Sequence, residues 1–319
     1  MKVAITDYTF PDLDIERSIL EAQGCEVVAG QCKTPEALID LTTDVDYVIT
    51  QFAPIDASVI NAMQKAKIIV RYGIGYDNVD CDASRTKQIP VCNIPDYCID
   101  EVADHTLAFI LSMTRSVRAN CRHMMRGNWG VGVELEQMRT LRDQTVGILG
   151  LGRIGKAVAT RLRGFGGQTL ASDPVVSAED ASSLGCTLVE LDTLLATSDI
   201  VTLHCPSNEH TRNVINRNSL QKMKAGAILI NVGRGDLVDL AALTEALQSE
   251  HIAAAALDVF NPEPLAADSP LLQMDNVIVS SHIASASPKA TRTLRETAAN
   301  LVVTAIQGKP LPNVVNDVN

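Results

Sequence analysis

Short runs of apolar residues recur along the second half of the chain, separated by stretches with the period of an amphipathic helix. Runs of this kind are typical of strands buried on both faces of a parallel sheet. Their alternation with helices predicts a doubly wound α/β domain that binds ligands at the carboxyl ends of its strands. The expected strands are residues 146–149, 169–172, 187–189, 200–204, 227–232, 254–259 and 277–280.

The first part of the chain repeats this pattern more weakly and predicts a second, smaller α/β domain. Its expected strands are residues 2–5, 26–28, 46–50, 68–71 and 91–92, and its expected helices are residues 13–23 and 35–41. Residues 101–115 have helical periodicity and suit a crossing between domains, and the helical pattern of 288–308 suits a return to the first. We therefore expect residues 1–99 and 288–319 to form a substrate-binding domain in which a nucleotide-binding domain, residues 100–287, is inserted.

A glycine-rich turn follows the first strand of the predicted inserted domain. Gly150, Gly152 and Gly155 fit the pattern G-x-G-x-x-G between an apolar run and a helical pattern. In a dinucleotide site the first glycine permits the tight turn, the second admits a pyrophosphate and the third allows close helix packing. Amide groups at the start of the helix then face the phosphates. The alternative interpretation is a glycine-rich packing turn.

An acidic residue stands where a dinucleotide site needs one. Asp173 ends the next apolar run, about 20 residues beyond the turn, where a carboxylate binds the hydroxyl groups of the adenosine ribose. Its charge would repel a 2′-phosphate, and no arginine follows in residues 174–177. The sequence therefore favours NAD over NADP.

Composition and charge narrow the class of protein further. Hydrophobic residues make up 46% of the chain and aromatic residues 3%, which suits aliphatic strands and argues against disorder. The formal charge of −11 and the absence of a basic run argue against a nucleic-acid partner. No apolar run reaches membrane-spanning length, and the N-terminus reads as a strand rather than a signal peptide. The eight cysteines lack the paired spacing of zinc sites, so we expect buried thiols, no metal and a cytoplasmic location.

Three polar residues stand just past three predicted strands of the inserted domain: Arg234, Glu263 and His282. Taken singly they could be a surface cation, a solvated loop acid and a capping histidine. Together at one crevice they are chemically complementary. A guanidinium offers a planar fork to a carboxylate and a carbonyl oxygen, and a histidine exchanges the proton that accompanies hydride transfer. A carboxylate beside the ring orients it and favours the imidazolium.

With these residues the chain resembles the D-isomer-specific 2-hydroxyacid dehydrogenase family, and most closely its phosphoglycerate dehydrogenase and C-terminal-binding-protein branches. The resemblance covers nearly the whole chain in family order. It rests on the motifs RYGIGYDNVD at 71–80, CNIPDY at 92–97, EVADH at 101–105, the turn at 150–155, LHCP at 203–206, NVGRG at 231–235, LDVF at 257–260 with Glu263-Pro264, and SHIA at 281–284.

The resemblance implies a fold, a reaction and a set of site residues. It implies a doubly wound NAD domain inserted in a smaller flavodoxin-like domain, a homodimer through the region of residues 115–142, and interconversion of a 2-hydroxy acid and its 2-keto acid. Arg234 would be the substrate anchor, His282 the acid/base and Glu263 its partner, with substrate also near the backbone of Tyr72, Gly73 and Ile74 and near Ser285. The implied cofactor contacts are Gly150, Gly152, Arg153, Ile154, Gly155, Asp173, Cys205, Pro206, Thr211, Val232, Gly233, Arg234, Asp258, His282 and Ala284.

Departures from the family pattern bear on the substrate. Ser281 stands where proline often precedes the histidine, and Ser285 replaces a glycine or tryptophan. Phe52 stands where a phosphate-binding arginine is expected, so a phosphorylated substrate is not favoured. The chain stops soon after the returning helix, and we expect it to lack the regulatory domain of long phosphoglycerate dehydrogenases. Two other functions stay open: an NAD-sensing interaction protein without turnover, and a dehydrogenase of another small anion such as formate or phosphite.

Overall fold

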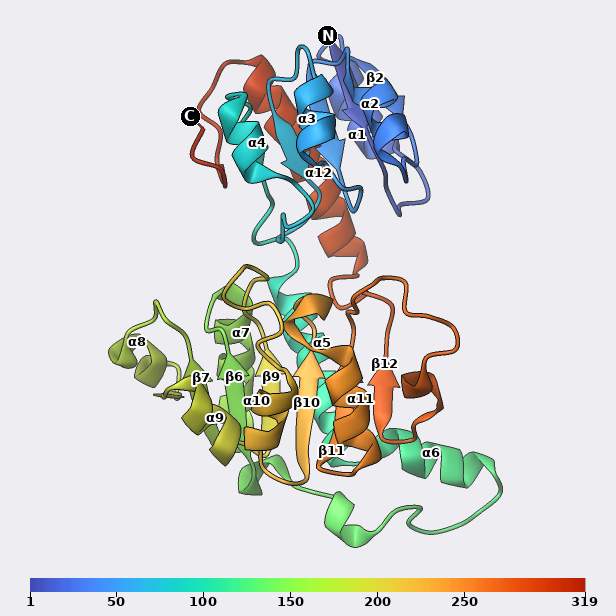
Figure 1. Ribbon diagram of the computed structural model, residues 1–319, viewed down its shortest axis with the longest axis vertical. Coiled ribbons are helices and arrows are strands. Elements are labelled where there is room, and N and C mark those ends of the chain that lie inside the picture. Colours follow the sequence, from blue (N-terminus) through green and yellow to red (C-terminus); the bar gives the residue numbers. More distant parts are fainter. Residues whose placement is uncertain (319) are drawn as a thin grey trace. The chain divides into compact units, whose positions relative to one another are not determined.

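The computed structural model describes residues 1–318, which divide into two compact units (Figure 1). Unit 1 consists of Met1–Tyr97 together with the residues from Ser287 onward, and unit 2 is Cys98–Ala286. The chain therefore leaves unit 1 once and returns to it. Both units are parallel α/β structures, as the hydrophobic pattern predicts.

Unit 1 holds a five-stranded sheet in the order β2-β1-β3-β4-β5, in which every pairing is parallel. This is the flavodoxin-like order, so that prediction is confirmed. The strands are β1 (Lys2–Ile5), β2 (Glu26–Ala29), β3 (Tyr47–Thr50), β4 (Ile69–Arg71) and β5 (Val91–Cys92). The helices are α1 (Asp14–Glu21), α2 (Pro35–Thr42), α3 (Ala57–Ala62), α4 (Cys81–Thr86) and α12 (Pro288–Ile306).

Apolar clusters lie on both faces of this sheet, because alternate strand residues point to opposite sides. Val3 and Ile5 face one cluster, which also contains residues of α1 and α12, and Ala4 faces the other. In Figure 1 the red helix α12 lies among the blue and cyan elements of the N-terminal segment. Pro288 at the first turn and the Ser287 side chain, which accepts from the Ala290 amide at 2.9 Å, fix the start of α12.

Unit 2 holds a seven-stranded parallel sheet in the order β12-β11-β10-β9-β6-β7-β8. The chain order reverses between β6 and β9, which places the ligand crevice of such a fold at the carboxyl end of β6. The strands are β6 (Thr145–Leu149), β7 (Gln168–Ser172), β8 (Thr187–Leu188), β9 (Ile200–Leu203), β10 (Ala227–Asn231), β11 (Ile252–Leu257) and β12 (Val277–Val279). The helices are α5 (Ile99–Thr114), α6 (Val117–Met125), α7 (Arg153–Leu162), α8 (Ala178–Ser183), α9 (Leu191–Thr197), α10 (Arg217–Lys222) and α11 (Leu240–Gln248).

Helices cover both faces of the unit 2 sheet. The buried side chains of α9, α10 and α11 form one apolar cluster with those of β9, β10 and β11. α5 packs against α7 and also contacts β10 and β11. No helix among the described residues is long and apolar enough to cross a membrane.

Several predicted strands extend too far at their carboxyl ends. Residues 204, 232, 258–259 and 280 lie outside the strands, since the chain turns into loops one or two residues earlier. β11 also starts earlier than predicted, at Ile252. Apolar residues such as Val232 and Val259 are buried beneath the loops, so hydrophobicity alone does not mark the ends of the strands.

Candidate active site

The three glycines after β6 are required for different reasons. Gly150 has φ of +91°, and a Cβ atom there would lie 2.5 Å from the amide nitrogen of Cys205. A Cβ atom on Gly155 would lie 2.1 Å from the carbonyl oxygen of Gly150. At Gly152, in contrast, a Cβ atom would meet no atom within 4 Å. Contacts within the chain account for the first and third glycines, whereas the space beside Gly152 fits a ligand that approaches the backbone.

The start of α7 offers amide groups to that same space. α7 begins at Arg153, and its N-cap residue, Gly152, has no side chain that could accept from the first amides. The backbone ladder of the helix begins with the amide of Lys156, which donates to the Gly152 carbonyl at 2.9 Å. The amides of Arg153 and Ile154 therefore precede the ladder, where a helix binds anions. These residues fit the pyrophosphate of a dinucleotide.

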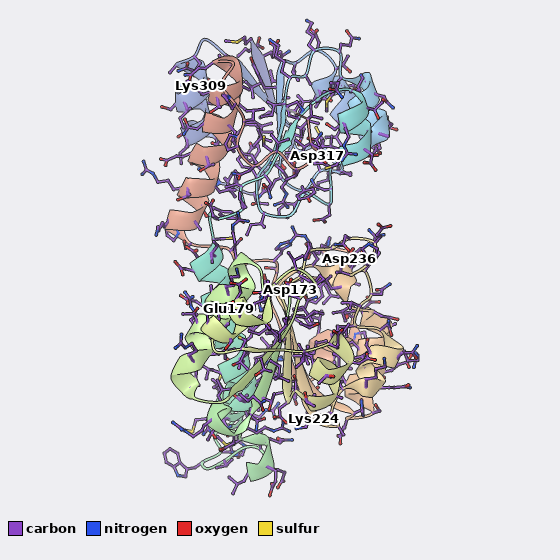
Figure 2. The ribbon with its side chains drawn as sticks, turned by 90° about the vertical axis from the view of Figure 1, so that its left-hand side faces the viewer. Asp173, Glu179, Lys224, Asp236, Lys309 and Asp317 are labelled. Atoms are coloured by element: carbon purple, nitrogen blue, oxygen red, sulfur yellow. The ribbon has the colours of Figure 1, made fainter. Side chains whose placement is uncertain are left out.

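Asp173 links the glycine turn to the end of β7. Its Oδ2 atom accepts from the Leu151 amide at 2.7 Å, and its Oδ1 atom accepts from Val175 and Val176 at 2.9 and 3.1 Å. An ionised carboxylate has about four acceptor positions, so it can still accept from a ribose hydroxyl. Figure 2 shows Asp173 and Asp236 at the same end of unit 2, with Lys224 at the opposite end.

The loop after β9 carries the residues predicted on the adenine side of the cofactor. The Thr211 hydroxyl donates to the Pro206 carbonyl at 2.6 Å and closes this loop. Burial raises the pKa of the Cys205 thiol to about 11, so the thiol is neutral. Burial also lowers the pKa of His204 to about 3, and its neutral ring contacts the Thr202 hydroxyl at 2.9 Å. His204 is therefore a structural residue in this geometry.

An acid–base pair lies past the ends of β11 and β12. Nδ1 of His282 is 2.9 Å from Oε2 of Glu263, and Oε1 of Glu263 accepts from the Phe260 amide at 2.9 Å. Burial raises the pKa of Glu263, whereas the hydrogen bond to His282 and the charge of that ring lower it. The Phe260 amide and the Arg234 guanidinium act in the same direction, so the pKa of this carboxyl lies below its ordinary value.

Asp258 is fully buried and frames the loop that carries His282. Its carboxylate accepts from the amides of Ile283 and Ala284 at 2.9 and 2.8 Å, and from the Ser280 hydroxyl. Its carbonyl accepts from the amide of His282 at 2.7 Å, and His282 has φ of +57°. The carboxylate thus holds its own loop together. Its predicted contact with the nicotinamide stays a prediction.

Arg234 lies in a turn just past β10. The side chain of Asn231 accepts from the Gly233 amide at 3.1 Å and donates to the Arg234 carbonyl at 2.8 Å, which fixes the turn. A Cβ atom on Gly235 would lie 2.0 Å from the carbonyl carbon of Phe260. The Arg234 turn therefore packs directly against the segment that binds Glu263. The buried Val232 precedes it at the strand end.

The three backbone amides predicted to hold the substrate in unit 1 differ in their hydrogen bonds. The Tyr72 amide donates to Thr50 and the Gly73 amide to Arg71, both at 2.8 Å, so the fold already uses these two groups. Among the described residues no group accepts from the Ile74 amide, and the Ile74 carbonyl accepts from the Asn93 side chain at 2.6 Å. Substrate binding by the backbone of Tyr72, Gly73 and Ile74 stays a prediction, and the Ile74 amide is the one that the fold leaves available for it.

Sequence reasoning missed the residues that shape these turns. Asn231 is 1% exposed at the end of an apolar strand, and a buried amide at that position is the signal that could have revealed it. Ser280 and Asp236 show no comparable signal. Ser285 is half-buried in the loop after His282. Among the described residues, no group of three or more His, Cys, Asp or Glu side chains could hold a metal ion.

The sheet order and the glycine turn together define a dinucleotide-binding α/β protein. Within that class the chain belongs to the D-isomer-specific 2-hydroxyacid dehydrogenase family. Residues 107–284 match the model of that family's NAD-binding domain. The family predicted from the motifs is confirmed, and the predicted cofactor, NAD, agrees with the matched domain.

Relatives of known name extend the similarity to most of the chain. D-3-phosphoglycerate dehydrogenase of Archaeoglobus fulgidus is 39% identical over 302 residues, which cover 93% of this chain and 56% of that protein. Glyoxylate reductase of Korarchaeum cryptofilum is 37% identical over 293 residues, which cover 91% of this chain and 86% of the relative. The chain thus spans only about half the length of the phosphoglycerate dehydrogenase relatives.

Solved structures show the same fold. D-lactate dehydrogenase of Aquifex aeolicus, in complex with NAD and lactic acid, is 29% identical with a TM-score of 0.86, and 96% of each chain is covered. NAD-dependent formate dehydrogenase of Staphylococcus aureus, in complex with NAD, is 26% identical with a TM-score of 0.89, and 99% of each chain is covered.

Proposed function

We propose that this chain is an NAD-dependent oxidoreductase that interconverts a D-2-hydroxy acid and its 2-keto acid. The observation that carries the proposal is the His282–Glu263 pair beside the Arg234 turn. These groups follow β10, β11 and β12 of the sheet whose β6 leads into the glycine turn. An acid–base pair, an anion-binding guanidinium and a dinucleotide turn are the groups that this reaction needs.

In the reduction direction each of the three residues has a separate task. The guanidinium of Arg234 binds the carboxylate and the carbonyl oxygen of the keto acid through its planar fork. His282, protonated and held at Nδ1 by Glu263, donates the Nε2 proton to the carbonyl oxygen, which becomes the hydroxyl group. The ionised Glu263 fixes the orientation of the ring and stabilises the imidazolium. NADH, when bound, supplies the hydride that reaches C2 of the acid.

The residues present fit NAD. The open space beside Gly152 and the first amides of α7 suit the pyrophosphate, and Asp173 suits the ribose. The remaining proposed contacts are Cys205, Pro206 and Thr211 on the adenine side and Val232, Gly233, Asp258 and Ala284 toward the nicotinamide. In unit 1 the proposed substrate contacts are the backbone groups of Tyr72, Gly73 and Ile74.

We also propose a homodimer formed through the region that includes α6. Several large apolar side chains of this region are exposed, and a group of exposed apolar side chains is typical of a protein–protein interface. They include Val117, Met124, Met125, Trp129, Val131 and Leu135, with Trp129 at 90% exposure. None of the eight cysteines, all of them among the described residues, is in a disulfide bond, which suits the reducing cytoplasm that we propose as the location.

A substrate panel tests the proposed function. The full chain is mixed with NADH or NADPH and with short, branched and phosphorylated 2-keto acids, and oxidation of the cofactor is followed by absorbance. We expect turnover with NADH and at least one unphosphorylated acid. The reverse panel uses NAD with hydroxy acids, formate and phosphite. Binding of NADH without turnover of any acid would contradict the proposal and favour an NAD-sensing protein.

A further inference from the structure

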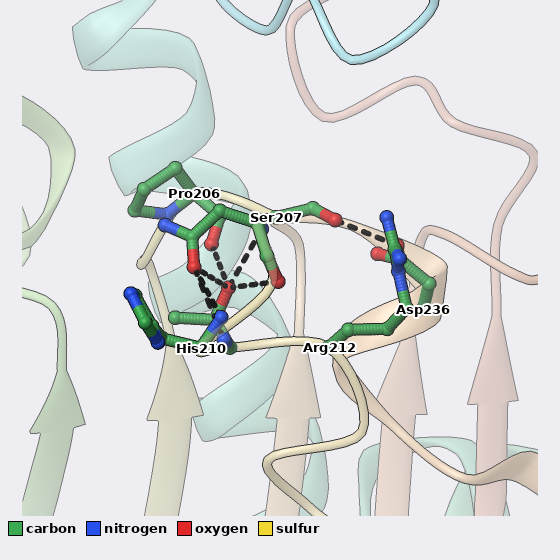
Figure 3. A network of polar contacts seen from close by, with 7 residues as sticks. Pro206, Ser207, His210, Arg212 and Asp236 are labelled. Carbon is green, nitrogen blue, oxygen red and sulfur yellow. Dashed lines mark hydrogen bonds and ion pairs between the residues drawn. The ribbon is translucent and has the colours of Figure 1, made fainter.

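A single carboxylate oxygen holds both ends of the loop that follows β9 (Figure 3). Oδ2 of Asp236 accepts from the Ser207 hydroxyl at 2.6 Å and from Nε of Arg212 at 3.3 Å. Ser207 and Arg212 are the two ends of the segment 207–212. Asp236 itself lies two residues after Arg234, in the short helical turn Gly235–Leu237.

The segment between these two ends is closed by its own hydrogen bonds. Oδ1 of Asn208 accepts from the amides of His210 and Thr211 at 2.9 and 3.1 Å, and the Thr211 hydroxyl accepts from the Asn208 amide at 2.9 Å. These bonds order the backbone of the segment internally. The Asp236 carboxylate connects the Ser207 end of this segment to the Arg234 turn.

The backbone adds a second connection next to the first. The Asn213 amide donates to the Asp236 carbonyl at 2.7 Å, and the Ile215 amide donates to the Leu237 carbonyl at 3.0 Å. These bonds fix the far end of the loop whatever the side chain at 236. Ser207, at the near end, depends on the carboxylate. A hydroxyl that donates to an ionised carboxylate at 2.6 Å forms a stronger bond than a neutral pair.

On its other side the same turn contacts the acid–base segment. The close approach of Gly235 to the Phe260 carbonyl leaves no room for a side chain. The Phe260 amide in turn donates to Glu263, the partner of His282. The Arg234 turn thus contacts the loop after β9 on one side and Phe260, whose amide binds Glu263 of the acid–base pair, on the other.

From this arrangement we propose that Asp236 is a positioning residue that couples cofactor binding to substrate binding. The inference rests on the proposed function, in which the loop after β9 contacts the adenine side and Arg234 binds the acid. A dinucleotide seated on this loop favours one position of Ser207. Through Asp236, that position favours the arrangement of the turn in which Arg234 binds the keto acid. Coupling of this kind is reciprocal, so the acid strengthens binding of NADH by the same factor.

The test compares Asp236→Ala with the natural chain, using NADH and oxamate, an unreactive analogue of a short keto acid. NADH affinity is measured by fluorescence, and oxamate affinity is measured with and without NADH. We expect Asp236→Ala to weaken NADH binding about three- to tenfold, a range set by one charge-assisted hydrogen bond and a largely exposed ion pair. The strengthening of oxamate binding by NADH should disappear, and KM for the keto acid should rise more than kcat falls.

Further variants separate positioning from general damage. Ser207→Ala removes the hydrogen bond to Asp236 and should reproduce part of the loss of coupling. Asp236→Asn keeps an acceptor for Ser207, so its coupling should lie between that of Asp236→Ala and that of the natural chain. Glu245→Gln breaks the exposed Arg217–Glu245 ion pair of the same unit and should change neither affinity. Coupling that persists undiminished in folded Asp236→Ala or Ser207→Ala overturns the inference. The two hypotheses fail on different results. A natural chain that binds NADH but turns over no acid contradicts the proposed function. Unchanged NADH affinity in Asp236→Ala contradicts the role of the loop, whatever the turnover.

Discussion

Nδ1 of His282 lies 2.9 Å from Oε2 of Glu263, and the other oxygen of Glu263 is held by the Phe260 amide. The carboxylate is thereby fixed at both oxygens before any substrate arrives. Because Nδ1 faces the carboxylate, the proposed mechanism assigns proton exchange with the acid to Nε2. The variants below test that assignment.

Glu263→Gln should change the dependence of reduction on pH. The pKa of Glu263 is below its ordinary value, so the carboxylate stays ionised across the neutral range and stabilises a protonated imidazole. Glutamine keeps an acceptor for the ring but removes the charge. The alkaline limb of the pH profile of kcat/KM should therefore move to lower pH, so that reduction proceeds over a narrower range on the acid side. Steady-state rates between pH 5 and 9 would check this, and a superimposable profile would contradict the assigned role.

His282→Asn should remove proton transfer and leave the cofactor site intact. Loss of a general acid costs about 10²–10⁴-fold in rate, so kcat should fall by that factor. NADH affinity, measured by fluorescence, should stay within about twofold. A variant with near-normal kcat/KM would rule out His282 as the proton donor.

Arg234→Lys should lose the planar fork while keeping the positive charge. A lysine binds a carboxylate as a point charge and cannot bind the carboxylate and the carbonyl oxygen together in one plane. We expect kcat/KM for the keto acid to fall about 10²–10³-fold, in the range for a lost donor to a developing oxyanion. Comparison with Arg217→Lys, at an exposed position in the same unit, controls for the chemical change. Equal losses in the two variants would argue against a substrate anchor at 234.

Two glycine variants should separate cofactor binding from folding. Gly152→Ala places a methyl group in open space, so the melting temperature should stay unchanged while NADH binding weakens by about tenfold or more. Gly155→Ala places its methyl group against the Gly150 carbonyl and should destabilise unit 2 by about 1–3 kcal/mol. Calorimetry and NADH titration of both variants provide the comparison. Unimpaired NADH binding by Gly152→Ala would show that the space beside Gly152 is not the pyrophosphate site.

The buried ion pair of unit 1 should be sensitive to loss of one partner. Arg295 of α12 donates to both oxygens of Glu16 in α1, and Tyr72 donates to the same carboxylate at 2.9 Å. Arg295→Met leaves a fully buried charge without its cation, which typically costs about 3–5 kcal/mol. Adding Glu16→Gln should recover much of that loss, since glutamine still accepts from Tyr72. Urea unfolding followed by circular dichroism measures both, and equal stability of the single and double variants would contradict the expectation.

The architecture can be predicted well from the sequence, because parallel strands buried on both faces require short runs of apolar residues. β9 and β10 appear as continuous apolar runs, and the glycine turn follows β6 where the packing requires it. The predicted ends of the strands are less accurate, since an apolar residue such as Val232 is buried in a loop just past its strand and looks like part of it. Contacts between distant side chains left no trace in the pattern. Nothing in the sequence indicates that Asp236 meets Ser207, because that contact depends on how two loops of different strands approach each other.

α12 has a consequence for synthesis on the ribosome. Its side chains Leu294, Ala298 and Val302 belong to the same cluster as Val3 and Ile5 of β1, a strand that is made before all of unit 2. Unit 1 therefore cannot complete its core until residues past 306 have left the exit tunnel, whereas all of unit 2 has emerged by then. Domains generally fold as units during synthesis. The N-terminal segment accordingly lacks the α12 part of this cluster until the whole inserted unit has been made.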